Sequence, residues 1–310
     1  MAFSAQDVKA LRDKTGVGMM DCKRTLVEAD GDFDRALEIL RERASAAATK
    51  KAARITAEGI VLAYQENNVS VLIEVNSETD FVGKNPDFRA FVLDIAKTIA
   101  AENPADVETL ANLKLAGGDS SVEQARQDKI LSCGENLSIR RFACITGNPA
   151  VVSYVHMGGT IGVLAVFNAD SALAATEAFQ TAAKDVAMQI AAMSPEYLSA
   201  AAVPVDVLEE KKQAFAAELA EDPKMLNKPE KVLANIVQGR VAKFYKEACL
   251  LDQPFVKDGD ITVGQYIKNV ANEIGAAFEA VDFVRFVKGE NIAKREDDFA
   301  AEVAKAAGQG

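Results

Sequence analysis

The chain has 310 residues, 49% of them hydrophobic and 26% charged, and its formal net charge of −11 argues against direct binding of nucleic acid, because phosphate backbones are repelled. Four scattered cysteines and the single histidine, His156, match no metal-binding pattern, so we expect neither a metal nor another cofactor. The first residues do not resemble a signal peptide and no apolar run is long enough to cross a bilayer, which predicts a cytoplasmic protein without a membrane partner.

The first 55 residues are expected to form a small helical head followed by a tether. Ser4 and Asp7 have the spacing of a capping box at the start of a first helix. Two further short helices follow, the last of them capped by Asp32. The basic, alanine-rich segment 44–54 then has the composition of a helical or flexible tether.

The middle of the chain contains an internal duplication. Residues 59–104 can be laid on residues 150–195 at a constant offset of 91, which places Val75 on Val166. Each copy is expected to form two strands joined by a turn, then a loop and an amphipathic helix. Differences between the copies are therefore informative, because most shared positions serve packing.

Each copy is expected to close with a third strand, Leu137–Ile145 in the first and Phe278–Val287 in the second. These strands are farther apart than the rest of the duplication, which indicates an insertion at roughly residues 199–250. The inserted stretch is charged and helix-rich, with prolines at a central turn. It predicts a helical hairpin that stands out from the body.

The expected fold class is α+β, with two small three-stranded units at its centre. The expected domains are a helical head with its tether (1–55), a first core subdomain (56–147), a second core subdomain (148–198 and 251–289), the inserted helical hairpin (199–250) and a C-terminal helical module (290–310).

The loop before the helix differs between the two copies. The first copy has Phe81 beside Asp80, where the second has Ala172 beside Ser171. Two interpretations remain open from the pattern. Either Phe81 packs into its own core while Asp80 caps the next turn, or Phe81 is an aromatic anchor that inserts into a partner.

No catalytic site is recognisable. His156 lies on a turn, where a lone histidine is commonly just solvated, and no nucleophile accompanies it. The glycines at positions 16 and 18 are not followed by the lysine and hydroxyl residue of a phosphate-binding loop. The sequence thus predicts a protein that is not an enzyme. An adaptor that binds through its head, or an enzyme with an unrecognised site, remains an alternative.

Several stretches, taken together, resemble the bacterial elongation factor Ts family, and the resemblance covers nearly the whole chain. They follow one another from head to tail as Leu11–Lys23, Thr79–Val82, His156 with Ile161–Leu164, Gln253–Val256 and Val263–Gln265.

This resemblance implies a ubiquitin-associated-like (UBA-like) head, a duplicated core with small antiparallel sheets, a coiled coil in the inserted hairpin and a C-terminal module. It also implies a guanine nucleotide exchange factor that promotes GDP release from the translational GTPase EF-Tu during elongation. The hairpin would then permit a homodimer.

The resemblance also implies roles for particular residues. The loop formed by Thr79, Asp80, Phe81 and Val82 would enter the GTPase domain and disturb its Mg²⁺ site, with Phe81 wedged between helices. The remaining partner-binding residues would be Met19, Met20 and Lys23, on the same GTPase domain, and His156, on another domain of EF-Tu.

Overall fold

The computed structural model describes residues 3–148, 150–225 and 228–293, so most of the predicted C-terminal module lies outside the described residues. The described helices are α1 (Ala5–Thr15), α2 (Met19–Glu28), α3 (Phe33–Lys51), α4 (Asp80–Lys84), α5 (Pro86–Glu102), α6 (Val107–Asn112), α7 (Val122–Cys133), α8 (Ser171–Ala174), α9 (Glu177–Met193), α10 (Val205–Glu221), α11 (Glu230–Ala248) and α12 (Val263–Ile274), with short 3-10 turns η1 (Ala200–Ala202) and η2 (Leu250–Asp252). The described strands are β1 (Glu58–Glu66), β2 (Val69–Ser77), β3 (Leu137–Thr146), β4 (Val151–His156), β5 (Ile161–Asn168), β6 (Pro254–Phe255), β7 (Asp258–Thr262) and β8 (Glu279–Val287).

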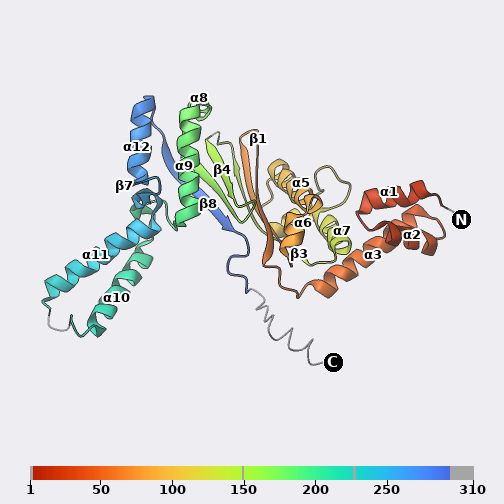
Figure 1. Ribbon diagram of the computed structural model, residues 1–310, viewed down its shortest axis with the longest axis horizontal. Helices are drawn as coiled ribbons and strands as arrows, with labels where there is room; N and C mark the ends of the chain where they lie inside the picture. Colours follow the sequence, from red (N-terminus) through yellow and green to blue (C-terminus); the bar gives the residue numbers. More distant parts are fainter. Residues whose placement is uncertain (1–2, 149, 226–227, 294–310) are drawn as a thin grey trace, which may run out of the picture.

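The molecule is elongated, with helices α1–α3 at one end and the α10–α11 hairpin at the other (Figure 1). Ser4 and Asp7 form the predicted capping box at the start of α1. Asp32 caps α3, which continues without a break to Lys51 and packs along α7. The expected tether is therefore helical over most of its length. Whether the head is UBA-like stays a prediction.

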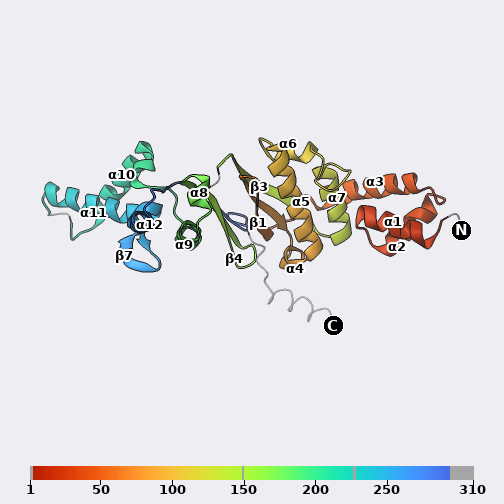
Figure 2. The ribbon, with the colours of Figure 1, turned by 90° about the horizontal axis from the view of Figure 1, so that it is seen from above.

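Two three-stranded antiparallel sheets form the centre, in the orders β1-β2-β3 and β4-β5-β8, which confirms the α+β class. The first sheet packs one face on α5 and the second packs one face on α9. Their other faces meet, with Val61 and Leu72 of the first sheet against Leu164 of the second. Figure 2 shows the resulting order of layers: α9, the two sheets, then α5.

The duplication is visible in the helices, but its register in the strands differs from the expected one. Helices α5 and α9 both have 17 residues and begin 91 positions apart. Val75, however, faces α5, whereas Val166 faces the opposite sheet. Phe167 occupies the place that corresponds to Val75 and faces α9. The constant offset of 91 is therefore wrong by one residue in the second strand.

The reason lies in the turns. The β1–β2 turn has two residues, Asn67 and Asn68, both with positive φ, as a tight hairpin turn of type I′ requires. The β4–β5 connection is longer, running from Met157 to Thr160. Strand side chains alternate between faces, so a shift of one residue moves every side chain to the other face. The offset of 91 therefore lies between the two true offsets. The true offset is one residue smaller in the first strand of each copy and one residue larger in the second strand.

The last helices of the two copies also correspond. Helices α7 and α12 both have 12 residues, and each begins at a hydroxyl N-cap, Ser121 or Thr262. Each ends at a glycine in the left-handed conformation, Gly134 or Gly275. The short β6–β7 hairpin precedes α12 and was not expected from the sequence.

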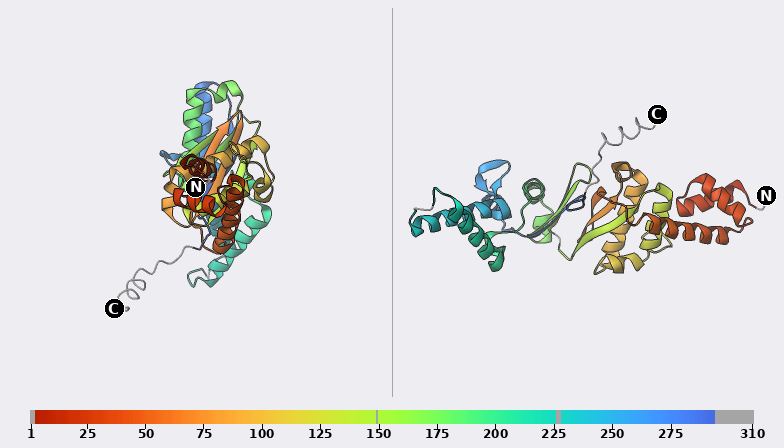
Figure 3. Two further views of the ribbon diagram at one scale, coloured as in Figure 1. Left: turned by 90° about the vertical axis from the view of Figure 1, so that its right-hand side faces the viewer. Right: turned by 90° about the horizontal axis from the view of Figure 1, so that it is seen from below.

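The inserted stretch forms two helices, α10 and α11, which pack on each other and project away from the sheets (Figure 1; Figure 3). An ion pair between Arg240 and Glu218 joins them, and the Arg240 guanidinium also lies over the Phe215 ring. Among the described helices, none combines the length and hydrophobicity that a membrane-spanning helix needs.

Candidate docking surface around Phe81

The first candidate residues lie at the point where β2 ends and α4 begins. The Phe81 side chain is 81% exposed, the largest exposed fraction of any bulky apolar residue that the structure describes. It therefore does not pack into its own core. Asp80 does not cap the turn either, because its carboxylate pairs with Lys84 one turn along α4. The structure thus excludes the interpretation in which this segment serves only internal packing.

Two carboxylates hold the base of this tip, which we define as residues 79–82. Glu135 accepts a hydrogen bond from the Thr79 N–H at 3.0 Å and another from the Thr79 hydroxyl at 2.5 Å. Glu78, in the loop before α4, accepts a hydrogen bond from the N–H of Asn136, in the loop before β3. Glu78 also forms an ion pair with Arg54 at 3.2 Å. The loops before α4 and before β3 therefore brace each other, which fixes the direction in which the tip projects.

Close backbone packing holds α4 against β1. Gly83 is buried, and a Cβ atom placed there would lie 2.6 Å from the carbonyl oxygen of Gly59 in β1. Val82 is half-buried against the core of the first sheet. Successive residues of the tip thus have opposite roles, since Val82 anchors the helix while Phe81 points away from the protein.

The charges at the tip favour an ionised carboxylate. A hydrogen bond from Lys84 holds the pKa of Asp80 below its usual range. Lys288 lies close enough to add a smaller effect in the same direction. Asp80 consequently presents a negative charge beside the exposed ring at neutral pH.

The β4–β5 turn lies beside the tip, and His156, which was expected on a turn, is instead the last residue of β4, paired with Ile161. Arg89 donates from Nε to the Gly83 carbonyl at 3.2 Å and from Nη2 to the Gly158 carbonyl at 2.8 Å. His156 is exposed, and its Nδ1 lies 2.9 Å from the Tyr154 hydroxyl. The tertiary structure therefore brings together two candidate sites, at Phe81 and His156, that are 75 positions apart in the sequence.

The same turn contains a candidate residue that sequence reasoning missed. Met157 is 76% exposed and has a left-handed backbone, with φ of 45°. The sequence could have revealed Met157, because only the second copy has a bulky apolar residue in the turn between its first two strands. An exposed methionine is well suited to a protein contact because it adapts its shape.

The candidate residues of the head lie on α2. Met20 is 66% exposed, Met19 and Lys23 are also exposed, and Val27 adds a further apolar side chain at 58%. Val27 was not expected, although its spacing of seven residues from Met20 places both on one helix face. In Figure 2, α2, α4 and the free end of β4 all lie on the lower side of the molecule.

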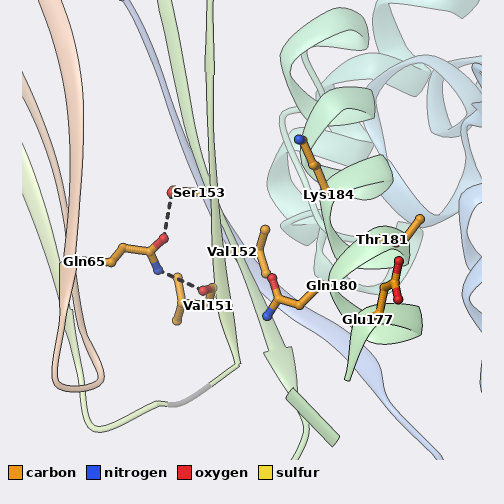
Figure 4. A pocket seen from close by; sticks show the side chains of 8 residues that line it. All are labelled: Gln65, Val151, Val152, Ser153, Glu177, Gln180, Thr181 and Lys184. Carbon is orange, nitrogen blue, oxygen red and sulfur yellow. Dashed lines mark hydrogen bonds between the residues drawn. The ribbon is translucent and has the colours of Figure 1, made fainter. Parts of the chain in front are cut away.

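A polar hollow of about 510 Å³ lies between β4 and α9, with Lys184 and Glu177 on its helical side (Figure 4). Gln65 reaches across from β1, donating to the Val151 carbonyl at 2.9 Å and accepting from the Ser153 hydroxyl at 2.6 Å. Within the described residues, no three His, Cys, Asp or Glu side chains are grouped to hold a metal ion. Gln65 therefore links the first core unit to the second at this hollow.

The thiols are poorly suited to nucleophilic chemistry. Burial raises the pKa of Cys22, Cys133 and Cys144, and it raises the pKa of Cys249 to about 11. These cysteines are consequently protonated at neutral pH. The exposed features around Phe81 and on α2 are those of a protein-docking surface, with apolar anchors beside charged groups.

Comparison with known proteins gives a consistent result. The family model "Elongation factor TS" matches residues 78–290. The chain is 45% identical to an elongation factor Ts of Trichlorobacter lovleyi over 99% of both chains. It is 44% identical to one of Clostridium kluyveri over 98% of both, and 42% identical to one of Syntrophotalea carbinolica over 98% of this chain and 99% of the relative.

Proposed function

Because this chain belongs to the elongation factor Ts family, we propose that it is a guanine nucleotide exchange factor for the GTPase EF-Tu in translation elongation. The observation that carries the proposal is the exposed Phe81 ring on a tip whose base is held rigidly by Glu135 and Gly83. A bulky apolar side chain on a fixed support can enter a partner without first paying for its own ordering.

The tip acts as a wedge in this proposal. Phe81 separates helices of the GTPase domain, and Asp80 brings its negative charge to the same place. Thr79 and Val82 orient the wedge, since one is bound to Glu135 and the other is packed on the core. The groups of EF-Tu that the wedge displaces then no longer hold Mg²⁺ in place. Nucleotide binding weakens because the metal supplies the largest local charge beside the phosphates.

This role requires linkage between two binding events and no covalent chemistry. If EF-Tu with an empty site binds this chain more tightly than EF-Tu with GDP does, the chain weakens GDP binding by the same factor. A well-buried aromatic anchor contributes about 2 kcal/mol or more to an interface. Since about 1.4 kcal/mol corresponds to a tenfold change in affinity, one such contact shifts nucleotide affinity more than tenfold.

Two further surfaces supply affinity in this proposal. Met19, Met20 and Lys23 on α2 dock on the same GTPase domain, while His156 and its turn contact another domain of EF-Tu. Arg89 supports this arrangement because it holds the turn at a fixed position relative to the tip. The contacts at separate places would keep the wedge engaged while GDP leaves.

The test follows the release of a fluorescent GDP analogue from EF-Tu after addition of this chain. Release should accelerate at micromolar protein, and excess GDP should weaken the complex on a sizing column. An unchanged release rate refutes the exchange function. A complex that excess GDP does not weaken contradicts the linkage, even if the two proteins bind.

We also propose that the α10–α11 hairpin is the surface for a homodimer. Val205 is exposed at the start of α10 and Val232 is exposed in α11, so the hairpin has uncovered apolar side chains. Sedimentation equilibrium of the full chain should then show a dimer that Val205→Asp weakens. Weak interfaces are commonly examined at protein concentrations on the order of 100 µM, and a chain that is still monomeric there would contradict the homodimer proposal.

A further inference from the structure

A groove of about 750 Å³ lies between α12, the first residues of β8 and the segment that leads into the inserted hairpin. Its floor contains the buried side chains of Ile267 and Phe278. Small residues form part of its walls, namely Ala200, Ala201, Gly264, Ala271, Ala277 and Ala280, and polar side chains such as Gln265, Lys268 and Asn272 form another part. The groove belongs to the second core unit. Helix α12 and strand β8, which border it, lie away from α4 and α2 (Figure 1; Figure 2).

The first core unit has a groove at the equivalent place, between α7 and the first residues of β3, but its volume is only about 290 Å³. The correspondence follows from α7 and α12, which begin 141 positions apart. In that register Arg126 corresponds to Ile267, and Asn136 corresponds to Ala277. The duplication therefore provides an internal comparison of one groove in two forms.

Polar side chains and a chain segment occupy the groove of the first unit. Arg126 lies in it, donating to the Leu137 carbonyl at 2.6 Å. Asn136 donates to the carbonyl oxygens of Ala52 at 3.4 Å and Arg54 at 3.1 Å. The segment 52–54, which joins α3 to β1, thus docks along this groove through its backbone.

The second unit has no equivalent of that segment among the described residues, because the chain has one head and one α3. It also lacks both polar fillers, since Ile267 and Ala277 replace the arginine and the asparagine. The result is a larger groove with an apolar floor. The small residues on its walls leave room for a side chain bulkier than Ala52, the alanine by which the docked segment lines the first groove.

We infer that this groove binds an extended segment of another protein, with one bulky aliphatic side chain placed over Ile267 and Phe278 and basic residues beside it. The rim favours basic flanks because it carries two carboxylates and one cation, Lys268; Glu279 is exposed, and Asp252 accepts a hydrogen bond from the Ala200 N–H at 3.0 Å. Within the described residues Glu279 makes no ion pair. The segment docked in the first unit is itself basic, with Lys51 next to it and Arg54 within it.

The test uses the full chain and fluorescein-labelled peptides of the pattern Lys-Lys-X-Ala-Arg, read by fluorescence anisotropy. The peptide with leucine at X should bind at least tenfold more tightly than the peptide with glycine at X. An acidic peptide, Glu-Glu-Leu-Ala-Glu, should bind more weakly than the basic leucine peptide. Equal binding of the leucine and glycine peptides, or no binding at millimolar peptide, overturns the inference.

Two matched variants locate the binding. Ala277→Phe should fill the groove from an exposed position and weaken the leucine peptide at least tenfold. Ala178→Phe places the same ring on the exposed side of α9 and should leave peptide binding unchanged. Both variants should melt near the wild-type temperature and release GDP from EF-Tu at the wild-type rate, which separates this inference from the exchange function. An Ala277→Phe protein that binds peptide like the wild type overturns it.

Discussion

The Glu135 carboxylate accepts two hydrogen bonds from Thr79, one from its backbone N–H and one from its hydroxyl. The two residues are 56 positions apart in the sequence, yet this contact sets the base of the tip that carries Phe81. Hydrogen bonds to an ionised group are stronger than those between neutral groups. Glu135 is therefore a positioning residue for the tip.

Replacing Glu135 by alanine should loosen the tip without removing any residue of the proposed interface. We expect GDP release from EF-Tu to slow several-fold, and the free energy of unfolding to fall by about 1 kcal/mol, because the pair is only partly buried. The control is Glu102→Ala, at an exposed carboxylate at the end of α5. Unchanged release kinetics in Glu135→Ala would show that the tip needs no such support.

Phe81→Ala should reduce the exchange rate by roughly 30-fold, the equivalent of about 2 kcal/mol for an interface anchor. Because the ring is exposed, the melting temperature should stay near that of the wild type. Val281→Ala removes an exposed apolar side chain of β8, outside the proposed binding surfaces, and should leave exchange unchanged. Normal exchange by Phe81→Ala would remove the wedge from the proposed mechanism.

Gly83→Ala tests the close contact beneath α4. The added Cβ atom would lie 2.6 Å from the Gly59 carbonyl oxygen, so the backbone must move apart. We expect the free energy of unfolding to fall by about 1–3 kcal/mol in urea titrations, and exchange to slow as the tip shifts.

Gly239→Ala is the matched control for this substitution. Gly239 lies within α11, and a Cβ atom there would meet no neighbour within 4 Å. Alanine is the better helix former, so this variant should gain up to about 1 kcal/mol of stability. Equal effects of the two substitutions would mean that α4 can move away from β1 freely.

The Asp80–Lys84 pair predicts a local dependence on pH. The pKa of Asp80 is lowered in the folded chain, mainly by the Lys84 hydrogen bond, so the pair is intact above the unfolded value of about 3.9. Its contribution is lost as the pH falls through the lower, folded value. An NMR titration of the Asp80 carboxyl carbon should show this, and Lys84→Met should move the midpoint up towards 3.9. A midpoint that does not respond to Lys84→Met would exclude this cause.

Local sequence patterns predicted several elements because the interactions that determine them are local. The capping box at Ser4, the cap at Asp32 and the apolar periodicity of α5 and α9 depend on residues within a few positions of one another. Motifs in order along the chain also indicated the family, which the comparisons confirm. The short β6–β7 hairpin carried no such pattern and was missed.

The register of the strands was predicted incorrectly for a physical reason. The turn between the two strands is two residues longer in the second copy, and a later loop of that copy is shorter. The two differences partly cancel, so a comparison at a constant offset does not detect them. Val75 and Val166 are both valines in buried strands, so composition does not reveal that they face different sides. Only the pairing of the strands distinguishes the two faces.

The sequence by itself determined the helices of the head, α5, α9, the inserted hairpin, the duplication and the family, since these are written in short-range patterns and in motifs along the chain. It did not predict α6, α7 or α12. Only the tertiary structure decided that Phe81 is exposed while its neighbour Val82 is anchored, because burial depends on which distant residues pack around a position. It likewise decided that Arg89 joins the tip to the turn beside His156, a contact between residues that the sequence places far apart.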